Sequence, residues 1–193
     1  MIWIIDNGHG VNTRGKSFRH NPLEYIREWE FNRELVSLII FMGQQKGLVF
    51  ERLVPEDIDI SLADRCKRAN LFFQDHPDSA LISIHGNAGG GTGWEAFTSP
   101  GETASDEIAT ELYRQAGKWL PGVRIRKDYS DGDPDKESRF YILVHTRCPA
   151  VLTENFFMDN YSDFKKMMDP AWRNRLAMVH VNAMLKYEKP LKS

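Results

Sequence analysis

Two histidines and one glutamate lie where three apolar segments of the chain end. Met1–Asp6 leads to His9, the segment 79–84 leads to His85, and the segment 150–153 leads to Glu154. Buried parallel strands are continuous apolar runs, and open α/β sheets bind ligands beyond the carboxyl ends of their strands. If the three strands are neighbours, two imidazoles and one carboxylate meet at the same edge of a sheet. This set is typical of a catalytic zinc ion with a general base beside it.

A catalytic zinc ion usually has three protein ligands, so one more is needed beside His9 and His85. The candidates are Glu24, Glu28 and Glu30, at the start of a predicted helix. At 100° per residue, Glu28 shares a face with the stripe that would pack on the sheet. That stripe consists of Asn32, Leu35, Val36 and Ile39. Because an unpaired buried carboxylate is costly, we predict that Glu28 binds the metal. The alternative is that Glu28 only interacts with the helix dipole.

Strand and helix patterns alternate along the chain and predict the elements that hold these residues. Strands are expected at 2–6, 48–54, 79–84, 94–98, 140–144 and 150–153. Helices are expected at about 23–45, 61–74, 104–120 and 170–187, and polar loops at 11–22 and 124–139. The alternation predicts an α/β fold, with a single domain and a twisted, mostly parallel sheet of about six strands flanked by helices on both faces. We expect the domain to span 1–188, followed by a polar tail at 189–193.

Composition excludes several classes of protein. A net charge of −2 and a pI of about 6.3 give no electrostatic reason to expect nucleic acid as a partner. No apolar run approaches the ~20 residues that span a bilayer, so no membrane insertion is expected. Cys66 and Cys148 form no CxxC pair, which favours two buried free thiols over a disulfide or a thiolate zinc site. The chain starts with a strand pattern and not with a basic and apolar leader, so we expect synthesis in the cytoplasm without a signal peptide.

Four motifs carry a resemblance to a known family. They are 6–10 (DNGHG), Glu28 four residues before Asn32, 83–88 (SIHGNA) and 149–160 (PAVLTENFFMDN). Weaker matches are 59–70 (DISLADRCKRAN) and 93–95 (GWE). In this order, from residue 2 to about 187, the motifs resemble the zinc-dependent N-acetylmuramoyl-L-alanine amidases of the Amidase_3 type. The chain has Asn7, Val11 and Glu51 where the family commonly has proline, glycine and threonine, which bears on loop shape and leaves the ligands unchanged.

The resemblance implies zinc held by His9, Glu28 and His85, with Glu154 as the catalytic carboxylate. It also implies that the substrate is peptidoglycan, cut at the amide between N-acetylmuramic acid and L-alanine. Zinc lowers the pKa of a bound water to about 7, and Glu154 would move its proton to the leaving nitrogen. Asn87 and Asn155 either contact the substrate or orient the loops. The family includes phage endolysins, and a phage lysis enzyme that acts on the cell wall would need no leader.

Two other functions remain open from the sequence. The first is another zinc amidohydrolase, such as a carboxypeptidase or a deacetylase, acting on a related substrate. The second is a non-catalytic peptidoglycan-binding module, against which the general base Glu154 argues. Asp6 either supports an imidazole N–H or caps the following turn. The other histidines, His20, His76, His145 and His180, are expected in ordinary core or surface positions, and Trp29, Phe31 and Phe41 are expected in the core.

Overall fold

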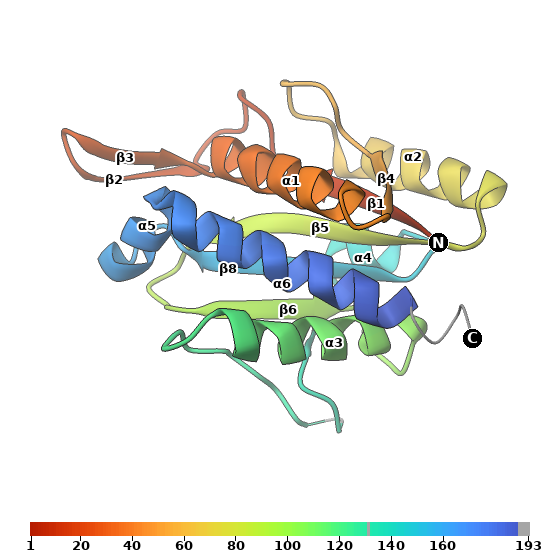
Figure 1. The fold of residues 1–193 in the computed structure, drawn as a ribbon. Coiled ribbons are helices and arrows are strands. Elements are labelled where there is room, and N and C mark those ends of the chain that lie inside the picture. The colour runs from red at the N-terminus through yellow and green to blue at the C-terminus, as the bar shows by residue number, and fades with distance from the viewer. Residues whose placement is uncertain (131, 189–193) are drawn as a thin grey trace.

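A six-stranded sheet forms the centre of the protein in the computed structural model, which describes residues 1–130 and 132–188 (Figure 1). The strands are β1 (Ile2–Asn7), β2 (Ser17–Asn21), β3 (Glu24–Arg27), β4 (Val49–Arg52), β5 (Ser79–Asn87), β6 (Trp94–Thr98), β7 (Lys136–Glu137) and β8 (Ala150–Phe157). The helices are α1 (Glu28–Gln44), α2 (Leu62–Asp75), α3 (Ala104–Trp119), α4 (Tyr141–Val144), α5 (Tyr161–Met168) and α6 (Pro170–Glu188). The expected tail at 189–193 lies outside the described residues.

The strand order is β4-β1-β5-β8-β6-β7. β1 is parallel to β4 and β5, and β5 is parallel to β8, whereas β6 is antiparallel to β8. The prediction of an α/β domain with a mostly parallel sheet is therefore confirmed. The three strands expected to carry the site, β1, β5 and β8, are neighbours, so their carboxyl ends share one edge of the sheet.

Helices cover both faces of this sheet. α1, α3 and α6 lie over one face, while α2 and α4 lie over the other (Figure 1). Successive strand residues point to opposite faces, and β1 shows this directly. Trp3 and Ile5 belong to the larger core, whereas Ile4 belongs to the smaller one. Burial on both faces explains why these strands are continuous apolar runs.

The predicted start of the first helix is wrong. The segments 17–21 and 24–27, expected in a loop and a helix, form the two-stranded β2–β3 hairpin, and α1 begins only at Glu28. In the hairpin Phe18 pairs with Ile26, which is buried beneath it. The Glu28 N–H donates to the Lys16 carbonyl at 2.9 Å, so the hairpin also supplies the first contact of the helix. Pairing across the hairpin thus outweighs the local helical pattern in this segment.

Two further elements differ from the prediction. The segment 140–144, expected as a strand, forms the short helix α4, in which the Leu143 and Val144 N–H groups donate to the Phe140 carbonyl. Its Ile142 and Leu143 side chains are buried against the smaller core. α5 was not predicted, and the Asn160 side chain caps it by accepting from the Asp163 N–H. Both helices are short, and so their patterns are too brief to show a helical period.

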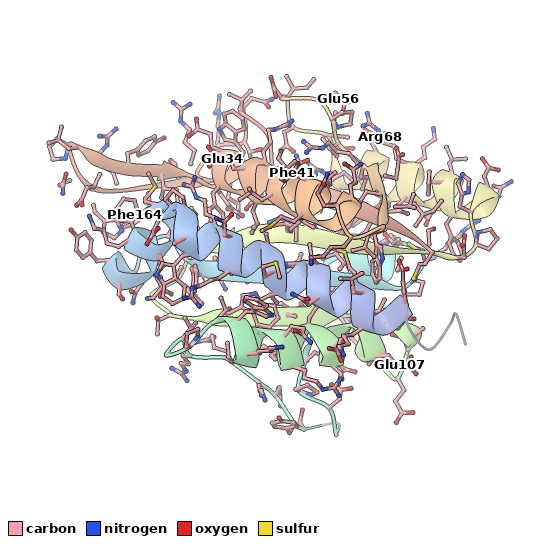
Figure 2. The ribbon with its side chains drawn as sticks, viewed as in Figure 1. Glu34, Phe41, Glu56, Arg68, Glu107 and Phe164 are labelled. Atoms are coloured by element: carbon pink, nitrogen blue, oxygen red, sulfur yellow. The ribbon has the colours of Figure 1, made fainter. Side chains whose placement is uncertain are left out.

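Individual core predictions can also be compared with the structure. Phe41, expected in the core, is 64% exposed and lies on the outer side of α1 (Figure 2). Phe31, on a different side of the same helix, is buried as expected. Cys66 and Cys148 are buried free thiols, which confirms the prediction. No helix among the described residues combines the length and apolar character needed to cross a bilayer.

Candidate active site

A cleft of about 420 Å³ is lined by residues at the carboxyl ends of β1, β5 and β8. His9, His85 and Glu154 all line it, as the strand arrangement predicts. Its polar side also includes Thr13, Lys16, Asp59 and Arg65, and its apolar side is formed by Ile60, Leu62, Phe140, Tyr141, Ile142 and Leu152. The cleft therefore joins a charged floor to an apolar wall, a combination common in sites for small ligands and chain-like substrates.

His9, Glu28 and His85 converge in the way the sequence predicts. Glu28 Oε1 lies 3.2 Å from His9 Nε2 and 3.1 Å from His85 Nδ1. The two imidazole rings lie 5.0 Å apart, nearly perpendicular to each other. One ligand atom from each residue lies within 4.8 Å of the other two. Asn32, Leu35, Val36 and Ile39 are buried on the same side of α1 as Glu28, which confirms the helical face used to choose it.

Atoms without partners show that these residues fit a metal ion. His9 Nε2 and Glu28 Oε2 are buried and have no hydrogen-bond partner among the described residues. Burial alone would raise the pKa of Glu28, but the adjacent imidazoles of His85 and His9 lower this pKa overall. Burial lowers the pKa of His85, yet Glu28 outweighs this effect and raises it. Two imidazole nitrogens and one carboxylate form a donor set that suits zinc with an open position.

Glu154 extends from β8 beside this group. In the sheet register it lies opposite His85 on β5 and opposite Glu95 on β6. Burial raises the pKa of Glu154 to about 7, and the nearby His85 and Lys16 oppose this effect. Glu154 Oε2 is buried without a hydrogen-bond partner in the described part of the chain. A carboxyl group that titrates near neutral pH is well suited to take up and release a proton.

The turn that carries His9 depends on one glycine. A Cβ atom on Gly8 would lie 2.1 Å from the His85 ring, so only glycine allows the two segments to approach this closely. His9 itself has a φ of 67°, in the left-handed region that residues with a side chain seldom adopt. Such backbone conformations persist where the surrounding contacts impose them. The residues around His9 must therefore hold its backbone in place.

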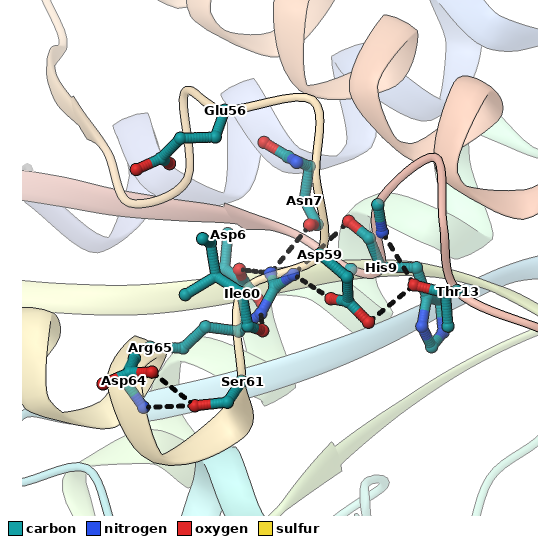
Figure 3. Close-up of polar contacts among 12 residues, drawn as sticks. Asp6, Asn7, His9, Thr13, Glu56, Asp59, Ile60, Ser61, Asp64 and Arg65 are labelled. Carbon is teal, nitrogen blue, oxygen red and sulfur yellow. Dashed lines mark hydrogen bonds and ion pairs between the residues drawn. The ribbon is translucent and has the colours of Figure 1, made fainter.

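Arg65 supplies much of that support (Figure 3). Its guanidinium is 2% exposed and donates to the backbone carbonyls of Asn7 and His9 and to the carboxylates of Asp6 and Asp59. These hydrogen bonds and ion pairs hold the turn that follows β1 in place. Asp6, one of whose predicted roles was to support an imidazole N–H, instead binds Arg65 and the Ser83 hydroxyl. Asp6 therefore contributes to the site through the arginine.

The two asparagines named from the sequence occupy different environments. Asn87 Nδ2 donates to Glu95 Oε1 at 2.8 Å, beside the cleft. Asn155 is fully buried, and its amide donates to the His85 carbonyl and accepts from Trp94 Nε1. Asn155 therefore ties β8 to β5 and β6. A substrate contact by either asparagine stays a prediction.

Three further polar residues shape the site without having been predicted. Lys16 Nζ lies 3.6 Å from Glu28 Oε2, and Arg65 holds the β1 turn. Glu95, 3% exposed, accepts from Arg126 and Lys136. A charged residue inside the apolar segment 94–98 was a signal for Glu95. Lys16 lies in a polar loop, where no periodic pattern distinguishes it from its neighbours.

Known proteins share the sequence pattern and the fold of this chain. The model of the Amidase_3 family, described as N-acetylmuramoyl-L-alanine amidase, matches residues 4–186. The chain belongs to this family. It is 32% identical over 183 residues to the N-acetylmuramoyl-L-alanine amidase CwlM of Bacillus licheniformis, covering 94% of this chain and 66% of that protein. It is 25% identical to the endolysin of Bacillus phage SPP1, covering 95% of this chain and 64% of that protein.

A solved structure supports the same family fold. The crystal structure of an N-acetylmuramoyl-L-alanine amidase from Clostridium difficile 630 superposes with a TM-score of 0.79 at 26% identity, covering 100% of this chain and 97% of that chain. The chain spans just under two thirds of the length of the curated relatives named above. The shared region is thus the α/β domain described here.

Proposed function

We propose that this chain hydrolyses the amide bond between N-acetylmuramic acid and L-alanine in peptidoglycan, with zinc as its cofactor. The observation that carries the proposal is the convergence of His9, Glu28 and His85 in an Amidase_3 family member, beside a cleft that His9, His85 and Glu154 line. His9, Glu28 and His85 would hold the zinc ion. The cell wall is then the place where the protein acts, as the endolysin name of one relative also suggests.

The residues of the cleft divide the chemistry between them. A zinc ion held by His9, Glu28 and His85 would polarise the scissile carbonyl and would make a water molecule acidic enough to attack near neutral pH. Glu154 takes the proton from that water as it attacks and then delivers the proton to the alanine nitrogen, which would otherwise be a poor leaving group. Burial, which raises the pKa of this carboxyl to about 7 before any metal binds, favours its uptake of a proton. Arg65 keeps the His9 backbone in position throughout.

The product of digestion tests this proposal. Purified peptidoglycan is incubated with zinc-loaded protein, and the new chain ends are identified by mass spectrometry. The expected result is free amino-terminal L-alanine, with intact glycan strands and intact peptide carboxyl ends. A His85→Ala variant, with its zinc content measured by elemental analysis, should lose both the metal and the product.

Other products would identify the alternatives. Terminal amino acids released from the stem peptide would indicate a carboxypeptidase, and released acetate would indicate a deacetylase. Retention of the protein on peptidoglycan with no new chain ends would indicate a binding module. Any of these three results in place of free L-alanine would overturn the proposal.

A further inference from the structure

Three aspartates form a second acidic cluster outside the cleft. Asp106 lies in the first turn of α3, and Asp133 and Asp135 lie just before β7. One carboxylate oxygen from each lies within 4.8 Å of the other two. β6 is antiparallel to β8: it begins at Trp94, opposite Asn155, and ends at Thr98. The cluster beside Thr98 therefore lies toward the amino end of β8. It lies outside the cleft lining, beside a residue three positions along β6 from Glu95, which is opposite Glu154.

Asp135 gives independent evidence that a ligand is needed. The side chain is 2% exposed, and its Oδ2 accepts a hydrogen bond of 2.6 Å from the Thr98 hydroxyl. Its Oδ1 is buried and has no hydrogen-bond partner among the residues that the structure describes. Burial, together with the Asp133 carboxyl, raises the pKa of Asp135 to about 8. Leaving a buried carboxylate oxygen without a partner is costly, so the free side of Asp135 calls for a positive charge.

The described residues that line the neighbouring surface offer no such charge to Asp135. An adjoining hollow of about 460 Å³ is lined by Gly101, Glu102, Asp106, Gly132, Asp133 and Glu137, with no basic side chain among these described residues. Lys136 is the nearest lysine in sequence, and its ammonium group donates to Glu95. Asp106 and Asp133 are partly exposed, so a cation can reach Asp135 from solvent past their carboxylates.

We propose that Asp106, Asp133 and Asp135 bind one calcium ion. Carboxylate oxygens are hard donors that suit Ca²⁺, Mg²⁺ and Mn²⁺ over softer metals. Ca²⁺ accepts an irregular shell of six to eight oxygens, whereas Mg²⁺ demands a near-ideal octahedron and usually keeps several waters. Carboxylates from two separate segments, with a hollow beside them for water, therefore match Ca²⁺ best. The proposal does not depend on the peptidoglycan reaction.

The ion would stabilise the position of the long segment that connects β6 to α4. The chain between β6 and α4 returns to the sheet at this point, where the Ser138 N–H donates to the Thr98 carbonyl. Directly after it come Phe140 and Tyr141, which line the wall of the cleft. A calcium ion shared by the start of α3 and the residues before β7 would hold this return in place. The site would thus set the position of the wall without touching the reacting groups.

Calcium binding is measured by titration calorimetry and thermal unfolding on the full chain carrying one equivalent of zinc, so that the histidine site is filled. The wild-type chain should bind one Ca²⁺ with a Kd of about 0.1 to 1 mM, the range of extracellular calcium modules. Saturating Ca²⁺ should raise its Tm by about 5 °C. Asp133→Asn should weaken binding by at least about tenfold and remove the Tm shift. Glu102→Gln, a matched control at the rim of the same hollow, should keep both.

Asp135→Asn provides a second variant, because the amide preserves the shape of the side chain and removes its charge. It should also lose the response to Ca²⁺. If the wild-type chain shows neither heat nor a Tm shift with Ca²⁺, Mg²⁺ or Mn²⁺, the Asp133–Asp135 pair holds only a proton and the proposal is wrong. An equal response in the wild-type chain and in Asp133→Asn would also overturn it.

Discussion

The two faces of β8 accommodate buried polar groups in different ways. Toward α6, Thr153 Oγ1 and His180 Nε2 lie 3.0 Å apart, and His180 Nδ1 lies 2.8 Å from the Leu176 carbonyl, which can only accept. Both ring nitrogens of this fully buried histidine are satisfied, and burial lowers its pKa to about 4. Toward the cleft, Glu154 and its neighbours have several buried atoms with no hydrogen-bond partner in the described part of the structure. Burial of a histidine is therefore not what marks the site. The site is distinguished by buried polar atoms that lack hydrogen-bond partners and lie close together.

The largest effect is expected at the cleft face of β8. Glu154→Gln keeps the shape of the side chain but removes its ability to accept a proton, so kcat should fall by about 10² to 10⁴. Zinc content should stay near that of the wild-type protein, because Glu154 is not one of the proposed ligands. Turnover is measured on purified peptidoglycan, with Glu51→Gln on the exposed edge strand β4 as the control. Undiminished hydrolysis would remove Glu154 from the mechanism.

The next effect is expected at Glu28, where buried atoms without hydrogen-bond partners are proposed to bind the metal. Glu28→Gln replaces an anionic ligand by a neutral amide, so zinc affinity should fall. The loss should exceed the roughly 10- to 100-fold that is typical when a residue hydrogen-bonded to a metal ligand is mutated. Affinity is measured by competition with a chelator. Glu30→Gln, on the exposed side of the same helical turn, should bind zinc like the wild-type chain. Equal affinity in both variants would contradict the ligand assignment.

A third prediction concerns the buried ion pair that supports the cleft. Removing one partner of such a pair leaves the other charge uncompensated, so Arg65→Met should lower the free energy of unfolding by about 3 to 5 kcal/mol. Arg68→Met on the same helix breaks the partly exposed pair with Glu56 (Figure 2) and should cost less than about 1 kcal/mol. Urea denaturation measures both. A similar loss in the two variants would mean that Arg65 contributes no more than a surface arginine.

The smallest effect is expected on the α6 face. His180 stays neutral when folded down to about pH 4, whereas the unfolded chain binds its proton below about 6.5. The unfolded state therefore takes up more protons between these values, and stability is full above pH 6.5 and falls as the pH decreases. At pH 5 this amounts to roughly 2 kcal/mol. In His180→Gln the decrease should flatten, while in the exposed His145→Gln it should persist. Parallel profiles for all three chains would show that His180 does not titrate this way.

Much of the fold and part of the site could be predicted because they depend on short-range patterns. The apolar runs before His9, His85 and Glu154 reflect strands that are buried on both faces. Such runs can be recognised from the local sequence alone. The face of α1 that carries Glu28 follows from the 3.6-residue period alone. The hairpin at 17–27 could not be predicted in this way, since Ile26 pairs with Phe18 across the hairpin and its side chain joins a core built from segments far apart in the chain.

The sequence by itself determined which residue types stand at the ends of which strands, and with them the family and the alternation of most strands and helices. Only the tertiary structure decided which side chains lack partners. Arg65 and Asp6 meet across 59 residues, and Asp106 lies near Asp135 although most of α3 and the segment after it separate them in the chain. Desolvation and charge pairing depend on distances in space, and residues far apart along the chain acquire those distances only when the sheet has formed.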